Sequence, residues 1–201
     1  MPALNIARGL VLLSFVLAFT LSYSGWFERF SSATLFGMGA LVSAGGFWTL
    51  HWLSSRFRGY SRQRGLKRLT RVQTLRFFGL LALVKAQQHV LPAIFGVPTG
   101  VMDAAMAITS FYVADRLVPP SGRPPRSFFV WHILGLVSLA ISVTLAILTS
   151  PTRFGLLKGG LTSQPMTWFP MSLVPTFIGP LVLICHLLAL VTASATPKQD
   201  K

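Results

Sequence analysis

The amino-acid sequence predicts an all-α fold, a polytopic transmembrane helical bundle of about six spans, from three observations. Hydrophobic residues make up 52% of the chain and charged residues only 11%, against about a quarter in soluble domains. The apolar residues gather in six runs, each about as long as a helix needs to cross a bilayer. Lys and Arg outnumber Asp and Glu by 18 to 4, and most of them fall in alternate connectors.

The expected spans form a single membrane domain over residues 1–201, and they cover residues 6–23, 33–53, 72–90, 97–113, 128–148 and 171–192. The first span begins like a signal peptide, but no small-residue cleavage site follows it, so we expect it to be retained. The second span is rich in Gly and Ala, and a strip formed by Gly37, Ala40 and Ala44 favours close approach of another helix. The last span carries Pro175 and Pro180, which are expected to kink it.

Segment 54–71 is the most basic part of the chain and is expected to lie in the cytoplasm as a loop. Both termini then also lie in the cytoplasm, and the protein is expected in the cell inner (plasma) membrane. This distribution accounts for the net charge of +14 without a nucleic-acid partner. Anionic lipid headgroups are the expected partners of the loop, unless its charges only fix the topology. The cations in question are Arg56, Arg58, Arg62, Arg64, Lys67, Arg68 and Arg71.

The third and fourth spans form a hairpin with more polar side chains than a membrane interior usually tolerates. Lys85 and Asp103 each lie six residues from an outer span end, so we expect them at one depth and paired. Pairing is favoured because an ionised group inside a bilayer costs about 2.5–3.5 kcal/mol. Arg76 is expected near the inner face, and an alternative is that Lys85 extends outward to the interface. The polar cluster comprises Arg76, Lys85, Gln87, Gln88, His89 and Asp103.

This cluster predicts a non-enzymatic membrane protein with an outward-facing site for an ion or small solute, or a docking face for a membrane complex or a second copy. One alternative is a redox protein in which His51, His132 or His186 of the inner half ligate haem b or a metal. No Cys-x-x-Cys-His or His-Glu-x-x-His motif supports it, so no cofactor is predicted. A second alternative is a lipid-modifying enzyme with Asp103 and His89 as its acid and base.

Two pairs of segments carry a family resemblance. TLRFFG at 74–79 is followed by LPAIFGVPTGVMD at 91–103, and PTFIGP at 175–180 is followed by HLLAL at 186–190. In these segments, about half of the chain, the sequence resembles a group of small uncharacterised bacterial multi-pass membrane proteins. The resemblance carries no activity, and it implies that Arg76, Asp103, Pro175 and His186 are the first residues to mutate.

Overall fold

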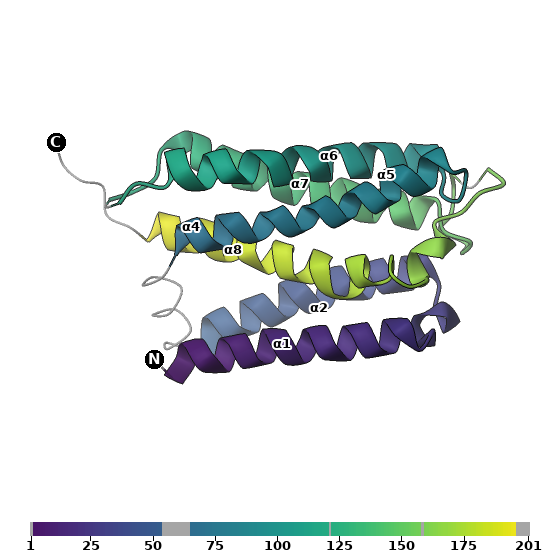
Figure 1. Cartoon of the computed structure of the whole chain (residues 1–201), viewed down its shortest axis with the longest axis horizontal. Helices are drawn as coiled ribbons and strands as arrows, with labels where there is room; N and C mark the ends of the chain where they lie inside the picture. The colour runs from purple at the N-terminus through teal and green to yellow at the C-terminus, as the bar shows by residue number, and fades with distance from the viewer. Residues whose placement is uncertain (1, 54–64, 121, 158, 196–201) are drawn as a thin grey trace.

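The computed structural model of the chain describes residues 2–53, 65–120, 122–157 and 159–195, with side chains placed except at 2–8 and 49–53. In this part of the chain the helices join end to end into six rods that lie side by side along the long axis (Figure 1). The rods are α1 (Pro2–Tyr23); α2 (Ser32–Leu53); α4 (Leu66–Arg71) with η2 (Val72–Gly79) and α5 (Leu80–Gln87); α6 (Ala93–Tyr112) with η3 (Val113–Leu117); α7 (Arg126–Leu148); and η5 (Val174–Ile178) with α8 (Gly179–Ser194). The all-α prediction is confirmed.

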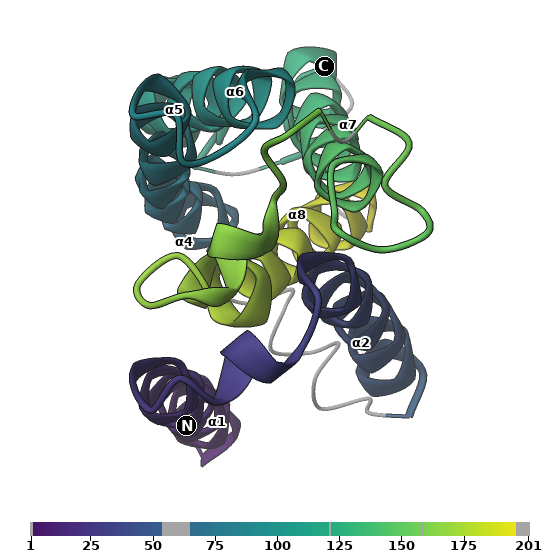
Figure 2. The same cartoon turned by 90° about the vertical axis from the view of Figure 1, so that its right-hand side faces the viewer.

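Successive rods run in opposite directions, so the molecule has two distinct ends (Figure 1). We call the end at which α4 begins and α6 ends the basic end, and the end at which α5 turns into α6 the hairpin end. Two short 3₁₀ helices lie in the connectors at the hairpin end, η1 (Trp26–Arg29) and η4 (Gln164–Thr167). Seen along the rods, α4, α5, α6, α7 and α8 surround a common interior, and α2 lies beside α8 (Figure 2). Helix α1 lies at the edge of the bundle and touches the last rod through Phe15, whose ring centroid lies 5.2 Å from that of Phe177.

Ionisable and other polar side chains are buried among apolar ones, while many large apolar side chains face outward, which is unusual for a soluble protein. Arg76, His132 and His186 are fully buried or nearly so, whereas large apolar side chains such as Ile108 and Leu134 are more than half exposed. Three helical stretches are long and apolar enough to cross a membrane: Ala93–Leu117, Arg126–Leu148 and Val174–Ser194. This distribution supports membrane association, because lipid favours apolar outer surfaces and makes buried polar groups pair with one another.

The hairpin is one turn tighter than the sequence predicts. The rod that ends with α5 begins at Leu66, six residues before the expected start, so the end of segment 54–71 is helical. At the other side of the turn α6 begins at Ala93, four residues before the expected start, so Pro98 is the sixth residue of the helix. At this position proline removes one backbone donor, and membrane helices tolerate such a loss. The reversal occurs between α5 and α6, where His89 adopts a left-handed backbone conformation with φ of 55°.

Two glycines of α6 let the arms of the hairpin touch. A Cβ added at Gly96 would lie 2.5 Å from the carbonyl oxygen of Ala82, and one at Gly100 would lie 2.5 Å from Cβ of Leu83. Spaced by four residues, the two glycines face the same side of α6, as in other small-residue contacts between membrane helices. This close packing fixes the register of α5 against α6, and with it the depth of the polar residues.

The contact of α2 and the shape of the last rod differ in detail from the predictions. A side chain at Gly37 would meet nothing within 4 Å, and Ala44 is exposed, so the predicted strip of small residues is wrong. Gly39 makes the close approach instead, against the carbonyl oxygen of Pro175. Pro175 lies in the π-helical turn η5, and Pro180 is the second residue of α8, so the prolines coincide with a change of helix type.

Candidate functional site

A buried ion pair between Arg76 and Asp103 occupies the middle of the bundle. Arg76 lies eleven residues before the end of α5, and Asp103 lies ten residues after the start of α6, so the tight hairpin places them level with each other. The guanidinium donates from Nε at 2.8 Å and from Nη2 at 2.5 Å to Oδ1 of Asp103. Only 1% of the Arg76 side chain and 9% of the Asp103 side chain are exposed.

Helix α7 accepts the remaining hydrogen bonds of the Arg76 guanidinium. Nη1 donates to the carbonyl oxygen of Gly135 at 3.3 Å, and Nη2 donates to Oγ of Ser138 at 2.7 Å. Ser138 in turn donates to the carbonyl oxygen of Gly135 at 2.8 Å. Arg76 therefore joins three rods, and its charge is both paired and hydrogen-bonded, as a buried charge requires.

The predicted ion pair between Lys85 and Asp103 is wrong. Lys85 lies only two residues from the end of α5, and its Nζ donates to Oε1 of Gln88 at 2.9 Å. This agrees with the alternative that Lys85 extends outward to the interface. The expectation that Arg76 lies near the inner face is also wrong, because its rod begins six residues earlier than predicted.

The remaining polar residues of the predicted cluster lie at the hairpin end. Gln87, Gln88 and His89 are exposed there, and Asp103 lies ten residues further down α6, about 15 Å away along the helix axis. The structure therefore splits the cluster into an exposed tip and a buried pair. It does not bring together His89 and Asp103, the acid and base of the enzyme alternative.

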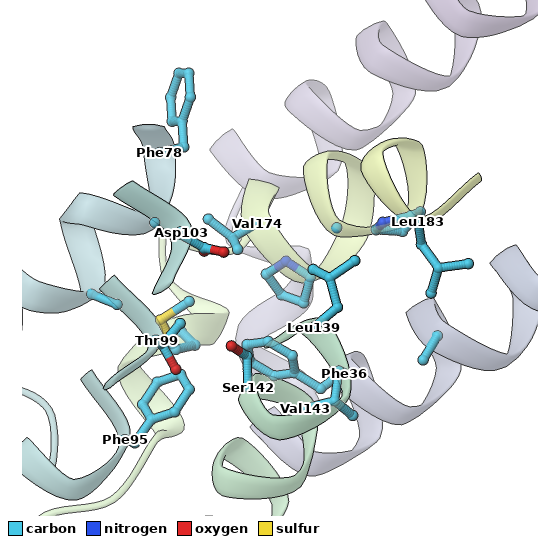
Figure 3. Close-up of a pocket in the computed structure, with 17 residues that line it drawn as sticks. Phe36, Phe78, Phe95, Thr99, Asp103, Leu139, Ser142, Val143, Val174 and Leu183 are labelled. Carbon is cyan, nitrogen blue, oxygen red and sulfur yellow. The ribbon is translucent and has the colours of Figure 1, made fainter. Parts of the chain in front are cut away.

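A cavity of about 60 Å³ adjoins the ion pair. The residues that line the cavity belong to α2, η2, α5, α6, α7, η4, η5 and α8. All of their side chains are apolar except those of Thr99, Asp103 and Ser142. Figure 3 shows the Asp103 carboxylate and the Ser142 hydroxyl directed toward the space between the two sides of the cavity. Thr99 is buried, and its hydroxyl has no hydrogen-bond partner in the described part of the chain. The cavity thus offers three polar side chains within an apolar wall, and the Thr99 hydroxyl is the one that lacks a partner in the described part of the chain.

Two of the three predicted inner-half histidines meet. His132 of α7 and His186 of α8 are fully buried, and their Nδ1 atoms lie 2.8 Å apart. That separation is a hydrogen bond, whereas two nitrogens bound at about 2.05 Å to one tetrahedral metal ion lie ~3.3 Å apart. The pair is therefore not arranged as two ligands of one ion, and the described residues contain no group of three or more His, Cys, Asp or Glu side chains that suits a metal. The side chain of His51 lies outside the described residues.

The basic segment is described only in its last residues. Lys67 and Arg71 both bind Asp115, with Nζ at 2.6 Å and Nη2 at 2.8 Å from Oδ1, and Arg68 is exposed. The other predicted lipid contacts, Arg56, Arg58, Arg62 and Arg64, lie outside the described residues.

Sequence reasoning overlooked the contribution of α7. His132, Gly135, Ser138 and Ser142 are buried and recur every three or four residues, which places them on one face of a helix. This stripe of polar and small residues in an apolar span could have indicated from the sequence that α7 is the helix that faces Arg76. Gln73, whose Nε2 donates to the carbonyl oxygen of Val182 at 3.1 Å, was missed because it lay near an expected span end.

The fold and the site define an all-helical, membrane-associated bundle built around an ion pair and a histidine pair. The chain belongs to the family described as domain of unknown function DUF8737, which matches residues 33–193. Neither the curated proteins nor the solved structures give a match. The matched region contains every residue of the buried site, and it leaves out α1.

Proposed function

We propose that this protein is a non-enzymatic, six-span protein of the cell inner (plasma) membrane, with both termini in the cytoplasm. The six antiparallel rods support the number of spans. The charges support the orientation. Three described cations lie at the hairpin end, Arg29, Lys85 and Arg153, against six at the basic end: Lys67, Arg68, Arg71, Arg116, Arg123 and Arg126. Positively charged connectors remain on the cytoplasmic side.

The orientation is tested with single cysteines in a Cys185→Ala background. A membrane-impermeant maleimide added to intact cells should label Arg153→Cys, and it should label Arg123→Cys only after the membrane is opened. The reverse pattern would place the basic end outside.

The function proposed for the bundle is to hold a small solute in the cavity beside Asp103. The observation that carries this proposal is the combination of an apolar wall with Thr99, Asp103 and Ser142, of which Thr99 has an unpartnered buried hydroxyl. Leaving a buried hydroxyl unpaired costs about 1–3 kcal/mol, which a bound hydrogen-bonding group would recover. The cavity also exceeds the ~10–15 Å³ that a single water needs.

The ion pair also indicates what kind of solute fits. Arg76 compensates the charge of Asp103 and binds it through two hydrogen bonds, so the cavity offers no net charge to a free ion. A neutral molecule with a polar group and an apolar body matches the lining better. The docking-face alternative has less support, because α7 covers the pair with Gly135 and Ser138.

The test is native mass spectrometry of the purified protein, with extraction and identification of whatever copurifies. Ala40 lines the cavity from α2, so Ala40→Phe should fill the space and release the bound molecule. Ala140→Phe is the matched control, because Ala140 is exposed on α7 and does not line the cavity. A wild-type mass equal to that of the chain alone, or a molecule that Ala40→Phe retains, would contradict the proposal.

The proposed partners at the basic end are anionic lipid headgroups. Because Lys67 and Arg71 bind Asp115, we assign the contact to cations that pair with no acidic side chain in the described part of the chain: Arg68, Arg116, Arg123 and Arg126. Arg123 stacks on Phe129, 5.1 Å from the ring centroid, and Arg153 stacks on Phe154 at 4.9 Å at the other end.

In nanodiscs of mixed lipid, Arg123→Gln should reduce the phosphatidylglycerol retained by the protein, and Arg153→Gln should not. Equal losses would exclude a contact specific to the basic end.

A further inference from the structure

The buried histidine pair belongs neither to the cavity nor to the ion pair, and its hydrogen bonds define its protonation. His132 and His186 approach through Nδ1 at 2.8 Å, with their rings nearly perpendicular at 82°. When both rings are neutral, one Nδ1 carries a hydrogen and the other accepts it. The two imidazoles must therefore be opposite tautomers.

Thr70 determines which ring is the donor. Its hydroxyl donates to the carbonyl oxygen of Leu66 at 2.7 Å, so its single hydrogen is already in use. At 3.4 Å from Nε2 of His132, the hydroxyl oxygen can only accept, which places a hydrogen on that nitrogen. Nδ1 of His132 then accepts from Nδ1–H of His186, and Nε2 of His186 is left with a bare lone pair.

That lone pair is buried and has no hydrogen-bond partner in the described residues. It lies against Gly135, where an added methyl group would overlap the His186 ring. The carbonyl oxygen of the same glycine accepts from Nη1 of Arg76 at 3.3 Å. One end of the histidine pair thus adjoins the Arg76–Asp103 site, and the other reaches Thr70, one turn from the start of α4 at the basic end.

The titratable groups on the surrounding elements do not compete for the pair. They are Lys67, Arg68 and Arg71 of α4, Arg76 of η2, Asp103 and Tyr112 of α6, Asp115 and Arg116 of η3, Arg126 of α7 and Cys185 of α8. Asp103 is bound by Arg76, and Asp115 is bound by Lys67 and Arg71. Because no carboxylate hydrogen-bonds to either ring in the described structure, the site has no group that would retain an added proton as a permanent ion pair. A proton that enters is therefore free to leave.

We infer that the His132–His186 pair is a proton relay between the Arg76–Asp103 site and the basic end. A proton donated by water or by a protonated carboxyl group binds Nε2 of His186. The hydrogen on Nδ1 of His186 crosses to Nδ1 of His132. The buried Thr70 hydroxyl takes the hydrogen from Nε2 of His132 and releases its own hydrogen, which it had donated to the carbonyl oxygen of Leu66, toward the basic end. One proton enters, one leaves, and both rings end as the opposite neutral tautomer. The relay stands whether or not the cavity holds a solute.

The first test is NMR spectroscopy of the full chain in nanodiscs, with the histidine side chains labelled with ¹⁵N. His132→Gln and His186→Gln assign the signals, and His89→Gln, at the exposed hairpin end, is the control. We expect His132 to carry its hydrogen on Nε2, His186 to carry it on Nδ1, and a scalar coupling to cross the shared hydrogen bond. Identical tautomers, or a doubly protonated ring at neutral pH, would overturn the assignment.

The second test separates a relay from a static pair. Exchange of the shared hydrogen with deuterated water should be several-fold slower in Thr70→Val, which keeps the shape of the side chain and removes the hydroxyl. Thr149→Val removes another buried hydroxyl that donates to the carbonyl oxygen four residues earlier, but at the hairpin end of α7, and it should leave the exchange rate unchanged. Equal exchange in wild type and Thr70→Val would overturn the route through Thr70, and slower exchange in Thr70→Val alone would support it.

Discussion

The rod formed by α6 and η3 carries two aspartates that bind cations in opposite surroundings. Asp103 is bound by one arginine inside the bundle, where its side chain is only 9% exposed. Asp115 is bound by both Lys67 and Arg71 at the basic end, where it is 45% exposed. The comparison indicates that burial, and not the number of partners, decides how much an ion pair matters to the fold. Removing one partner of a buried pair leaves an uncompensated charge, whereas water solvates the remaining charge of an exposed pair.

The largest expected effect comes from breaking the buried pair. Asp103→Asn should lower the free energy of unfolding by about 3–5 kcal/mol, because Arg76 remains buried without its counter-charge. Asp115→Asn makes the same chemical change at the exposed site, and Glu28→Gln makes a similar one on the exposed η1. Neither control should change the free energy of unfolding measurably, because water solvates the remaining charges. Unfolding in detergent by titration with dodecyl sulfate measures all three, and equal losses would contradict the comparison.

Removing both charges should be less harmful than removing one. In the variant Arg76→Met with Asp103→Leu, no charge remains to be desolvated, so we expect stability closer to wild type than either single substitution gives. A double-mutant cycle on the same unfolding curves measures the coupling. A loss in the double variant equal to the sum of the single losses would mean that the two side chains act independently.

A smaller effect is expected from the backbone that supports the site. Gly135→Ala should cost about 1–3 kcal/mol, because the new methyl group displaces the His186 ring. Gly37→Ala, where nothing lies within 4 Å, is the matched control and should be neutral. If the thermal melts of the two variants coincide, the contact between Gly135 and His186 is not tight in solution.

The smallest effect is the salt dependence of the exposed cluster. Salt at 1 M shortens the screening length to about 3 Å, so the coupling between Arg71 and Asp115 should weaken as salt rises. The coupling between Arg76 and Asp103 should change far less, because only 1% and 9% of the two side chains are exposed. Double-mutant cycles of both pairs at low and high salt make the measurement, and an equally salt-sensitive Arg76–Asp103 coupling would show that salt ions reach the buried pair.

The positions of the helices could be predicted from the sequence, but the partner of Asp103 could not. Apolar runs locate 33–53 and 128–148 to within two residues of α2 and α7, because lipid-facing surfaces demand continuous apolar sequence. The error arose at the turn, where the fourth span was expected to begin at residue 97 and α6 begins at Ala93. Moving the start of α6 back to Ala93 lowers Asp103 by four residues, away from Lys85 and level with Arg76. Ion pairing depends on a register that glycine contacts set, and a hydropathy pattern does not contain that information.

The buried site could be predicted only in part from the sequence, for a related reason. Arg76, Asp103, His132 and His186 stand out because ionisable groups are rare in apolar spans. Their pairing depends on which faces of α7 and α8 point inward. The polar stripe of α7 could have indicated its inner face, but the close approach at Gly135 appears only when the helices are packed.

The hairpin built on Gly96 and Gly100 also has a consequence for biosynthesis. Arg76 and Asp103 lie on consecutive helices, and each would be costly in lipid alone. In the proposed six-span topology, the helix with Arg76 emerges from the ribosome first and is expected to wait near the insertion channel until Asp103 is made. The two helices are therefore expected to leave the channel together, as one inserted unit, and a long spacer placed between them would be expected to trap the first helix at the channel.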